Sequence, residues 1–434
     1  RVTRQVARSQ ESVLLLGAGL LVAYVTFDAF GGWGEMVARD RAMAVGEQRL
    51  HLYNPTNHPG LPWTGVLTGL MVLHFYYWGS NQFIVQRALS AKTDRQARFG
   101  IIAAGFFKLL IPFFSIGTGI AAWYYFADRA EVVAQDVVFI ELLSDLVAPI
   151  APGLVGLVAA GMIGAILSSL DSMMNSAATI FTFDIYRRFI DPEASEKRLI
   201  AVGRVCIVVF ITGAALLTIL TMDPNSTDSF FLHIASHQGK LVAGVVVAFI
   251  VGMLWKRASG LGAFVAIVTG VALSYGIEPM YASLVAGNDA FAEAMVPTFG
   301  RSLNFFHAVF LAAIVSLILH VVLSLLIPPR EDQAKLTWAG LGVYKPTTLI
   351  KGFGIFGISL IIYAVLAVLM VMKTTTPLIA GLIAAVWTFA VFAVATARAN
   401  EDKDGKPAPP LLARDGIWGG LLAGCATFMM YYFY

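Results

Sequence analysis

Charged residues are scarce in this chain of 434 residues: they make up 13% of it, whereas 58% of the residues are hydrophobic. So little polar surface excludes one or two soluble domains of this length and favours lipid as the surrounding solvent. The 30 basic and 27 acidic residues are too evenly balanced to indicate nucleic acid as a partner. The composition therefore predicts an integral membrane protein in a lipid bilayer.

Cysteine is nearly absent, since only Cys206 and Cys425 occur, far apart and within apolar runs. This scarcity excludes a disulfide framework and a cysteine-based metal site, and it favours two buried, inert thiols. A signal peptide is not indicated, because Arg1–Arg8 leads into an apolar run without a small-residue cleavage site. We therefore expect the chain to start inside a longer protein.

Long apolar runs dominate instead. A helix needs about 20 mostly apolar residues to cross the hydrocarbon core, and the alternation typical of a membrane barrel is missing. The sequence therefore predicts an all-α, polytopic helical bundle with about eleven transmembrane helices. Their expected spans are 13–30, 64–85, 100–126, 152–186, 200–221, 229–255, 259–277, 303–327, 352–373, 376–397 and 415–433.

Basic residues gather in alternate loops, as in Arg87–Arg98 and Arg187–Arg198, whereas the loop 127–151 is acidic. Because Lys and Arg favour the cytoplasmic side, eleven spans predict a cytoplasmic start and an external end. The external loops 31–62 and 278–302 are long enough to hold short surface helices. The pattern indicates a single transmembrane domain over 1–434, a multi-pass protein of the plasma or inner membrane.

Segment 152–186 carries hydroxyl and small side chains where lipid disfavours polar groups. Their spacing of three or four residues forms one helical face, whose oxygens suit a sodium ion. A small-residue packing face is the alternative. Asp171 weakens that alternative, because a carboxylate at mid-membrane costs about 2.5–3.5 kcal/mol on translocon scales. The face comprises Ala165, Ser168, Ser169, Ser172, Asn175, Ser176 and Thr179.

Segment 64–85 has an aromatic and polar cluster at its centre, from His74 to Gln82. Gly79 among polar neighbours predicts a local break in the helix, which would free backbone carbonyls and direct aromatic faces at a ligand such as a sugar. An aromatic packing cluster with a hydrogen-bonded His74 is the alternative. Lys108 lies about nine residues inside its helix, deep for snorkelling, so we expect a polar ligand or an acidic partner beside it.

Three weaker patterns support only modest interpretations. Gly352–Gly357 matches the dinucleotide-binding string, but it lies in an apolar helix without a preceding strand, so close helix packing is favoured. His233 and His237 are four residues apart and could share a metal, but a third ligand is not evident and a polar helix start is favoured. Asn225 begins a glycosylation sequon by pattern only.

Two long strings carry a family resemblance. Tyr76–Lys92 and Ser168–Tyr186 closely resemble signatures of the sodium/solute symporter family, sodium/glucose cotransporter branch, and Gly252–Lys256 is similar to the family as well. The similarity extends from the first helix to about residue 277. The resemblance implies a LeuT-like fold, in which two inverted five-helix repeats hold ion and solute between them.

By this resemblance, 13–30 is the last helix of the first repeat, 64–255 is the second repeat, and 259–434 contains additional C-terminal helices. Most of the first repeat would then precede residue 1, and this chain alone would not transport.

The resemblance also implies roles for individual residues. Ala165, through its carbonyl, and Ser168 and Ser169, through their hydroxyls, fall on sodium-site positions, and Asp171 could bear on a second ion. Tyr77 matches the aromatic residue that stacks on the sugar and gates it. The remaining solute-site positions are Trp78, the neighbour of this aromatic, Lys108, a sugar-hydroxyl ligand, and His74, Ala235 and Ser236.

Two departures from the family pattern leave the solute open. His74 stands where threonine or asparagine is familiar, and the glutamine typical of sugar-binding members is missing near Ala235 and Ser236. The sequence predicts sodium-coupled symport of a small polar solute by alternating access, with sodium as coupling ion, no other cofactor and no enzymatic step. A sugar is favoured, and a polyol, carboxylate or amino acid is the alternative. Two alternative functions belong to other classes of protein: a membrane sensor, and a membrane enzyme that uses the His233–His237 pair.

Overall fold

The computed structural model describes residues 17, 19–44, 46–129, 133–221, 229–329, 331–338, 340–341, 346–397 and 410–434. Within these ranges the regular structure is helical, and the only β contact is an isolated bridge between Asn54 and Pro62. Eight of the described helices are long and apolar enough to cross a membrane. The all-α, polytopic architecture predicted from the sequence is therefore confirmed.

Every segment predicted to span the membrane is helical where it is described, but three do not form a long apolar helix. The helix Gly19–Phe30 is short, and only residue 17 is described in the earlier part of span 13–30. Span 64–85 is interrupted, as detailed below. The last span forms the 18-residue helix α18, which begins with Asp415 and contains several glycines and tyrosines.

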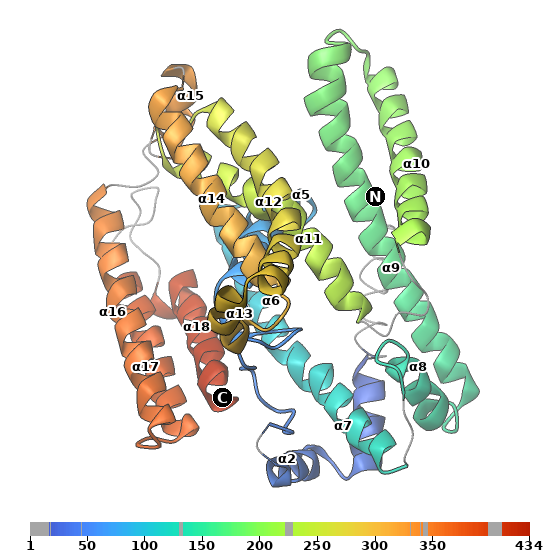
Figure 1. The fold of residues 1–434 in the computed structure, drawn as a ribbon. Coiled ribbons are helices and arrows are strands. Elements are labelled where there is room, and N and C mark those ends of the chain that lie inside the picture. Colours follow the sequence, from blue (N-terminus) through green and yellow to red (C-terminus); the bar gives the residue numbers. More distant parts are fainter. Residues whose placement is uncertain are drawn as a thin grey trace. The chain divides into compact units, whose positions relative to one another are not determined.

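The chain divides into two compact units (Figure 1). The first unit comprises Arg1–Arg49 and Leu110–Ser229. Besides Gly19–Phe30, its elements are α2 (Trp33–Ala42), α7 (Ile116–Ala127), α8 (Val138–Leu142), the π-helix η2 (Leu143–Val147), α9 (Pro152–Ile180), the π-helix η3 (Phe181–Ile190) and α10 (Glu196–Thr221).

The second unit comprises Leu50–Leu109 and Phe230–Tyr434, so the boundary falls inside α6 (Asp94–Phe114). Its other elements are α3 (Trp63–Leu67), α4 (Gly69–Phe75), the π-helix η1 (Tyr76–Ser80), α5 (Gln82–Leu89), α11 (Phe230–Leu254), α12 (Gly260–Gly287), α13 (Asp289–Phe299), α14 (Phe305–Leu326), α15 (Glu331–Lys335), α16 (Pro346–Val371), α17 (Pro377–Ala397), the 3₁₀ turn η4 (Leu411–Ala413) and α18 (Asp415–Tyr432).

The predicted second repeat, 64–255, contributes residues to both units, and its assignment as a repeat stays a prediction. The short surface helices expected in the two long external loops are present as α2 and α13.

The first unit is held together near its short helix α2. Arg39 of α2 donates a hydrogen bond of 2.6 Å to the Asp128 carboxylate, which follows α7. This guanidinium holds the pKa of the Asp128 carboxyl below its usual range. Tyr124 of α7 donates a hydrogen bond of 2.8 Å to Asp40, which is buried. Further along the chain, α9 and α10 form a helical hairpin (Figure 1).

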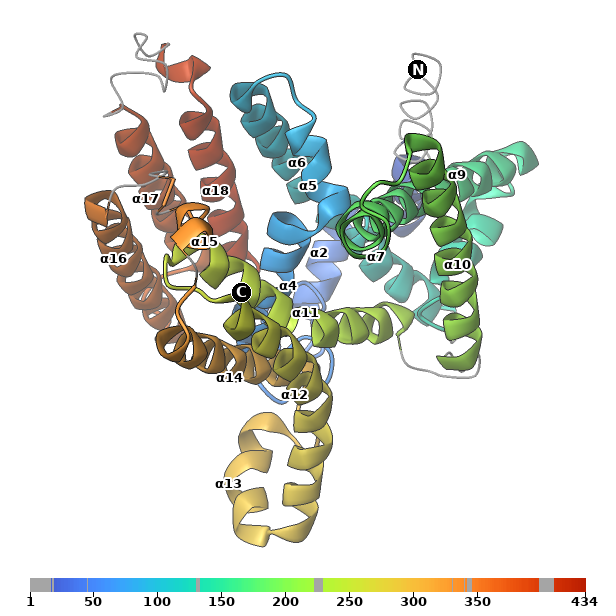
Figure 2. The same ribbon diagram turned by 90° about the horizontal axis from the view of Figure 1, so that it is seen from above.

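The second unit has a tightly packed core in which α11, α12 and α14 all contact one another (Figures 1 and 2). Small residues recur every fourth position on the buried face of α12, at Gly262, Ala266, Gly270 and Ser274. A Cβ added at Gly244 of α11 would overlap the carbonyl of Ala266. Because these residues have little or no side chain, the helix backbones approach closely, as small residues allow in membrane bundles.

Candidate functional site

The aromatic cluster of the second unit lies on an interrupted helix. Thr68 separates α3 from α4, and α4 continues into the π-helical turn Tyr76–Ser80. This turn ends at Asn81, whose backbone is extended and whose N–H donates to the Tyr76 carbonyl at 2.9 Å. The break predicted from Gly79 is confirmed, and it falls two residues later. A π turn inside a membrane helix is a common mark of a functional site.

Tyr77 and Trp78 of the π turn present their rings at the break. The two rings meet edge to face, with centroids 5.0 Å apart. The Lys108 ammonium lies 5.0 Å from the centroid of the Trp78 ring, a cation–π contact. The side chains of Trp78 and Lys108 are exposed within the described structure. Among the described residues an aromatic face, and not the acidic side chain considered for Lys108, lies beside its ammonium; the polar ligand stays a prediction.

The other predicted solute-site residues lie on neighbouring elements of the same unit. His74 lies in α4, one turn before Trp78 of the π turn. The His74 side chain is exposed and forms no hydrogen bond with any residue that the structure describes. The packing alternative, which required a hydrogen-bonded His74, is therefore weakened. Helix α11 contacts both α4 and η1. On α11, Ala235 packs against the unit's core and Ser236 is half-buried.

The predicted sodium residues lie on α9, in the first unit. Ala165 and Ser168 are half-buried, whereas Ser169 and Asp171 are exposed. The hydroxyls of this face differ in whether they form hydrogen bonds. Those of Ser172 and Thr179 donate to the carbonyls four residues earlier, at 3.0 and 2.7 Å. Across the described part of the chain, the hydroxyls of Ser168 and Ser169 form no hydrogen bond, so their oxygens are available to a cation.

Close packing explains only the end of this face. Ser176 and Ala178 are buried, but Ser169 and Asn175 are exposed, as are apolar neighbours such as Leu167. The alternative of a small-residue packing face therefore does not account for Ser169.

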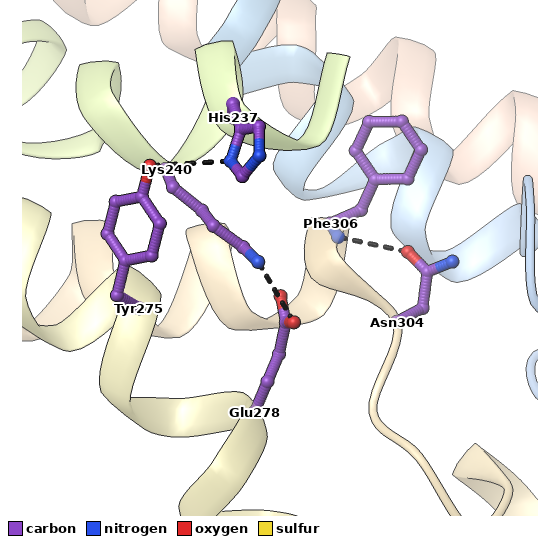
Figure 3. Close-up of polar contacts among 6 residues, drawn as sticks. All are labelled: His237, Lys240, Tyr275, Glu278, Asn304 and Phe306. Atoms are coloured by element: carbon purple, nitrogen blue, oxygen red, sulfur yellow. Dashed lines mark hydrogen bonds and ion pairs between the residues drawn. The ribbon is translucent and has the colours of Figure 1, made fainter. Parts of the chain in front are cut away.

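A charged pair that the sequence reasoning missed joins α11 to α12. The Lys240 ammonium lies 3.0 Å from the Glu278 carboxylate, and the Lys240 side chain is only 12% exposed. Figure 3 shows the pair with His237 and Tyr275, whose ring nitrogen and hydroxyl are 3.5 Å apart. The sequence contained a signal for this pair, namely two opposite charges within apolar helices, because such charges are costly in a membrane unless they pair.

The loop before α14 is fixed by its helix cap. The Asn304 side chain accepts a hydrogen bond of 2.9 Å from the Phe306 N–H (Figure 3) and donates to the Pro59 carbonyl at 2.6 Å. Asn304 thus ties the loop before α3 to α14.

The weaker patterns have mixed outcomes. Gly352–Gly357 lies inside α16, but added Cβ atoms at Gly352, Gly354 and Gly357 would meet nothing. The expected close packing is therefore wrong for the described residues, because the space around each of these three glycines is open. Cys206 is buried as expected, whereas Cys425 is exposed because it lies on an open side of α18. Asn225 lies outside the described residues.

Comparison with known proteins identifies the family. The model of the sodium:solute symporter family matches residues 8–270. A sodium/glucose cotransporter of Vibrio parahaemolyticus is 33% identical over 62% of this chain and 52% of its own length. The sodium/myo-inositol cotransporter 2 of Homo sapiens is 31% identical over 61% of this chain and 42% of its own length. The chain thus spans about half the length of the curated relatives it matches.

A solved structure supports the fold. The substrate-bound, outward-open state of a Na⁺-coupled sialic acid symporter matches 74% of this chain and 61% of its own chain, with a TM-score of 0.53 and 19% identity. At this identity the likeness concerns the fold, and it agrees with the LeuT-like helical architecture expected from the sequence. This chain is a multi-pass membrane protein, and it belongs to the sodium:solute symporter family, a family of transporters.

Proposed function

We propose that this chain forms part of a sodium-coupled symporter that moves a small polar solute, with a sugar or a cyclic polyol as the favoured class. Sodium binds first and stabilises the outward-open state, the solute follows, and a change of state releases both to the cytoplasm. Each sodium ion that enters across 100 mV supplies about 2.3 kcal/mol, which can drive accumulation of the solute.

The hydroxyl face of α9 is the observation on which the proposal depends. Sodium is a hard cation that prefers oxygen ligands. Ser168 and Ser169 offer hydroxyls that no residue of the described structure uses, whereas the neighbouring Ser172 has bonded its hydroxyl to its own helix. We assign Ser168, Ser169 and the carbonyl of Ala165 to one sodium ion, and Asp171 to a second ion or to its approach.

The solute side of the proposal rests on the break in the helix between α4 and α5. Tyr77 and Trp78 offer aromatic faces, and Lys108, held against the Trp78 ring, offers an ammonium donor for hydroxyl oxygens. Aromatic faces suit the C–H surface of a sugar or an inositol. His74 adds a polar group one turn away, and Ala235 and Ser236 complete the assigned solute residues from α11.

The direct test is uptake. The protein, expressed from its own gene and reconstituted in liposomes, is given labelled glucose, mannose or myo-inositol with an inward gradient of sodium or of potassium. We expect uptake of at least one solute with sodium only. Uptake that is equal with both cations would contradict sodium coupling.

A matched set of variants tests the ion residues. Ser168→Ala and Ser169→Ala should each raise the sodium concentration for half-maximal uptake by about tenfold, since each removes one cation ligand, worth roughly 1.4 kcal/mol. Ser172→Ala is the control and should leave this concentration nearly unchanged, because its hydroxyl already bonds to the Ser168 carbonyl. If Ser172→Ala has the largest effect, the assignment of the sodium ligands is wrong.

A further inference from the structure

The start of α11 carries a polar stripe that the proposed transport cycle does not use. His233, His237 and Lys240 are four and three residues apart, so they share one face of the helix. Tyr275 and Glu278 of α12 interact with this face (Figure 3). None of these five residues is among the assigned sodium or solute residues.

The two histidine rings lie side by side. Their centroids are 4.6 Å apart, their planes are nearly perpendicular, and both side chains are exposed. Two imidazoles at positions i and i+4 of a helix can direct nitrogens at one metal ion, the same spacing that zinc proteases use on a helix. Because both rings are exposed, their nitrogens are accessible to a metal ion.

Tyr275 of α12 contacts the His237 ring. Its hydroxyl is 3.5 Å from His237 Nδ1, and its ring stacks on the imidazole with centroids 6.2 Å apart. A ligating histidine usually donates its second ring N–H to an oxygen acceptor, which fixes the tautomer and the ring orientation. With Nδ1 directed at Tyr275, the Nε2 atom of His237 is the nitrogen that remains for a metal.

The ion pair one turn deeper limits the site to two protein ligands. Glu278 is bound to the Lys240 ammonium at 3.0 Å, so its carboxylate is engaged. In keeping with this, no group of three or more potential metal ligands of the His, Cys, Asp or Glu type occurs among the described residues. Two imidazoles with water in the other positions suit Cu²⁺, Ni²⁺ or Zn²⁺, whereas sodium and calcium prefer oxygen.

We propose that His233 and His237 form an exposed two-imidazole site for a divalent first-row transition-metal ion at the start of α11, with Tyr275 orienting the His237 ring. The site is chemically distinct from the hydroxyl face of α9. It does not depend on the proposed symport activity, because it can be tested by metal binding alone.

In the experiment, the purified protein in detergent is titrated with ZnCl₂ or with NiCl₂ near neutral pH, and isothermal titration calorimetry measures the binding. We expect one site, lost in His233→Asn and in His237→Asn. Tyr275→Phe should weaken binding by about tenfold, the size usual for loss of a second-shell partner. His51→Asn is the matched control, since it removes a histidine elsewhere in the second unit, and it should leave binding unchanged.

Paramagnetic resonance of the Cu²⁺ complex gives a readout that needs no variant. Hyperfine structure from two equivalent imidazole nitrogens supports the site even if a substitution prevents folding. A spectrum with one nitrogen or none, or full zinc affinity in both folded histidine variants, would overturn the proposal.

Discussion

Helices α9 and α11 are both long, apolar and rich in small residues, but they use those residues differently. On α11, the buried positions include Gly239, Gly244 and Ala243, and Gly244 meets the backbone of α12. On α9, Ser168 and Ser169 are only partly covered or exposed, and their hydroxyls stay unused in the described structure. Glycine at helical spacing brings backbones together, whereas serine at the same spacing keeps a polar group that can bind a ligand.

The largest expected effect tests this difference directly with two glycines. Gly244→Ala should destabilise the protein by about 3 kcal/mol, since the new Cβ overlaps the Ala266 carbonyl and the backbones must separate. Gly156→Ala in α9 should be neutral or stabilising by up to about 1 kcal/mol, because the added Cβ meets nothing and alanine favours a helix. Thermal unfolding in detergent measures both, and similar melting temperatures for the two variants would remove the distinction.

The next effect concerns the ion pair between α11 and α12. Lys240→Met should cost about 2 kcal/mol, because it leaves the Glu278 carboxylate without its cation, and Glu278→Gln should cost less. The double variant should recover part of the loss, which a double-mutant cycle on thermal stability measures. Strictly additive losses would mean that the two side chains do not stabilise each other.

A smaller effect is expected where Lys108 meets Trp78. Lys108→Met should weaken solute binding by about tenfold, roughly 1.4 kcal/mol, and leave the melting temperature nearly unchanged, because the side chain is exposed. Lys108→Arg keeps the cation over the ring and should retain most of the affinity. Quenching of tryptophan fluorescence by the solute provides the measurement. A large loss of stability in Lys108→Met would instead indicate that Lys108 stabilises the fold and does not bind the solute.

The smallest effect is local and depends on pH. In the loop before α3, His58 Nδ1 accepts hydrogen bonds from the N–H groups of Gly60 and Leu61, at 3.2 and 3.1 Å. Burial, with a contribution from His51, lowers the pKa of His58. The neutral ring is thus favoured in the folded state, so its stabilisation is complete above about pH 6.5 and decreases as the pH falls below that value.

Amide exchange at Gly60 and Leu61 should therefore accelerate between pH 7.5 and pH 5.5, after correction for intrinsic rates. Exchange in α9 of the first unit should show no such dependence, which provides the internal control. A His58→Asn variant that keeps the pH dependence would assign it to another group.

The sequence predicts the parts of this fold that the bilayer dictates. Apolar runs of membrane length became helices, and Gly79 among polar neighbours marked a real interruption, because both features depend on local composition. The π turn itself, the contact of Lys108 with Trp78 and the pairing of Lys240 with Glu278 could not be predicted. Each depends on which helices become neighbours, and hydropathy contains no information on that.

The sequence predicted that hydroxyl oxygens line one face of α9, but not which of these hydroxyls are available to a ligand. Spacing placed Ser168, Ser169 and Ser172 on one face, but it could not separate the serine that bonds to its own backbone from the two that do not. That distinction depends on side-chain rotamers, which the local sequence leaves undetermined.

The turn Tyr76–Ser80 holds one residue more than an α-helical turn would need. Deleting a single residue at the start of this turn would restore α-helical winding between α4 and the extended Asn81, and it would rotate the residues after the deletion by about 100° relative to α4, the angle of one α-helical residue. Tyr77 and Trp78 would then face other neighbours without any change in their own chemistry. The direction in which these rings point is thus set by the length of the chain at this turn, and a single-codon deletion or insertion could redirect them.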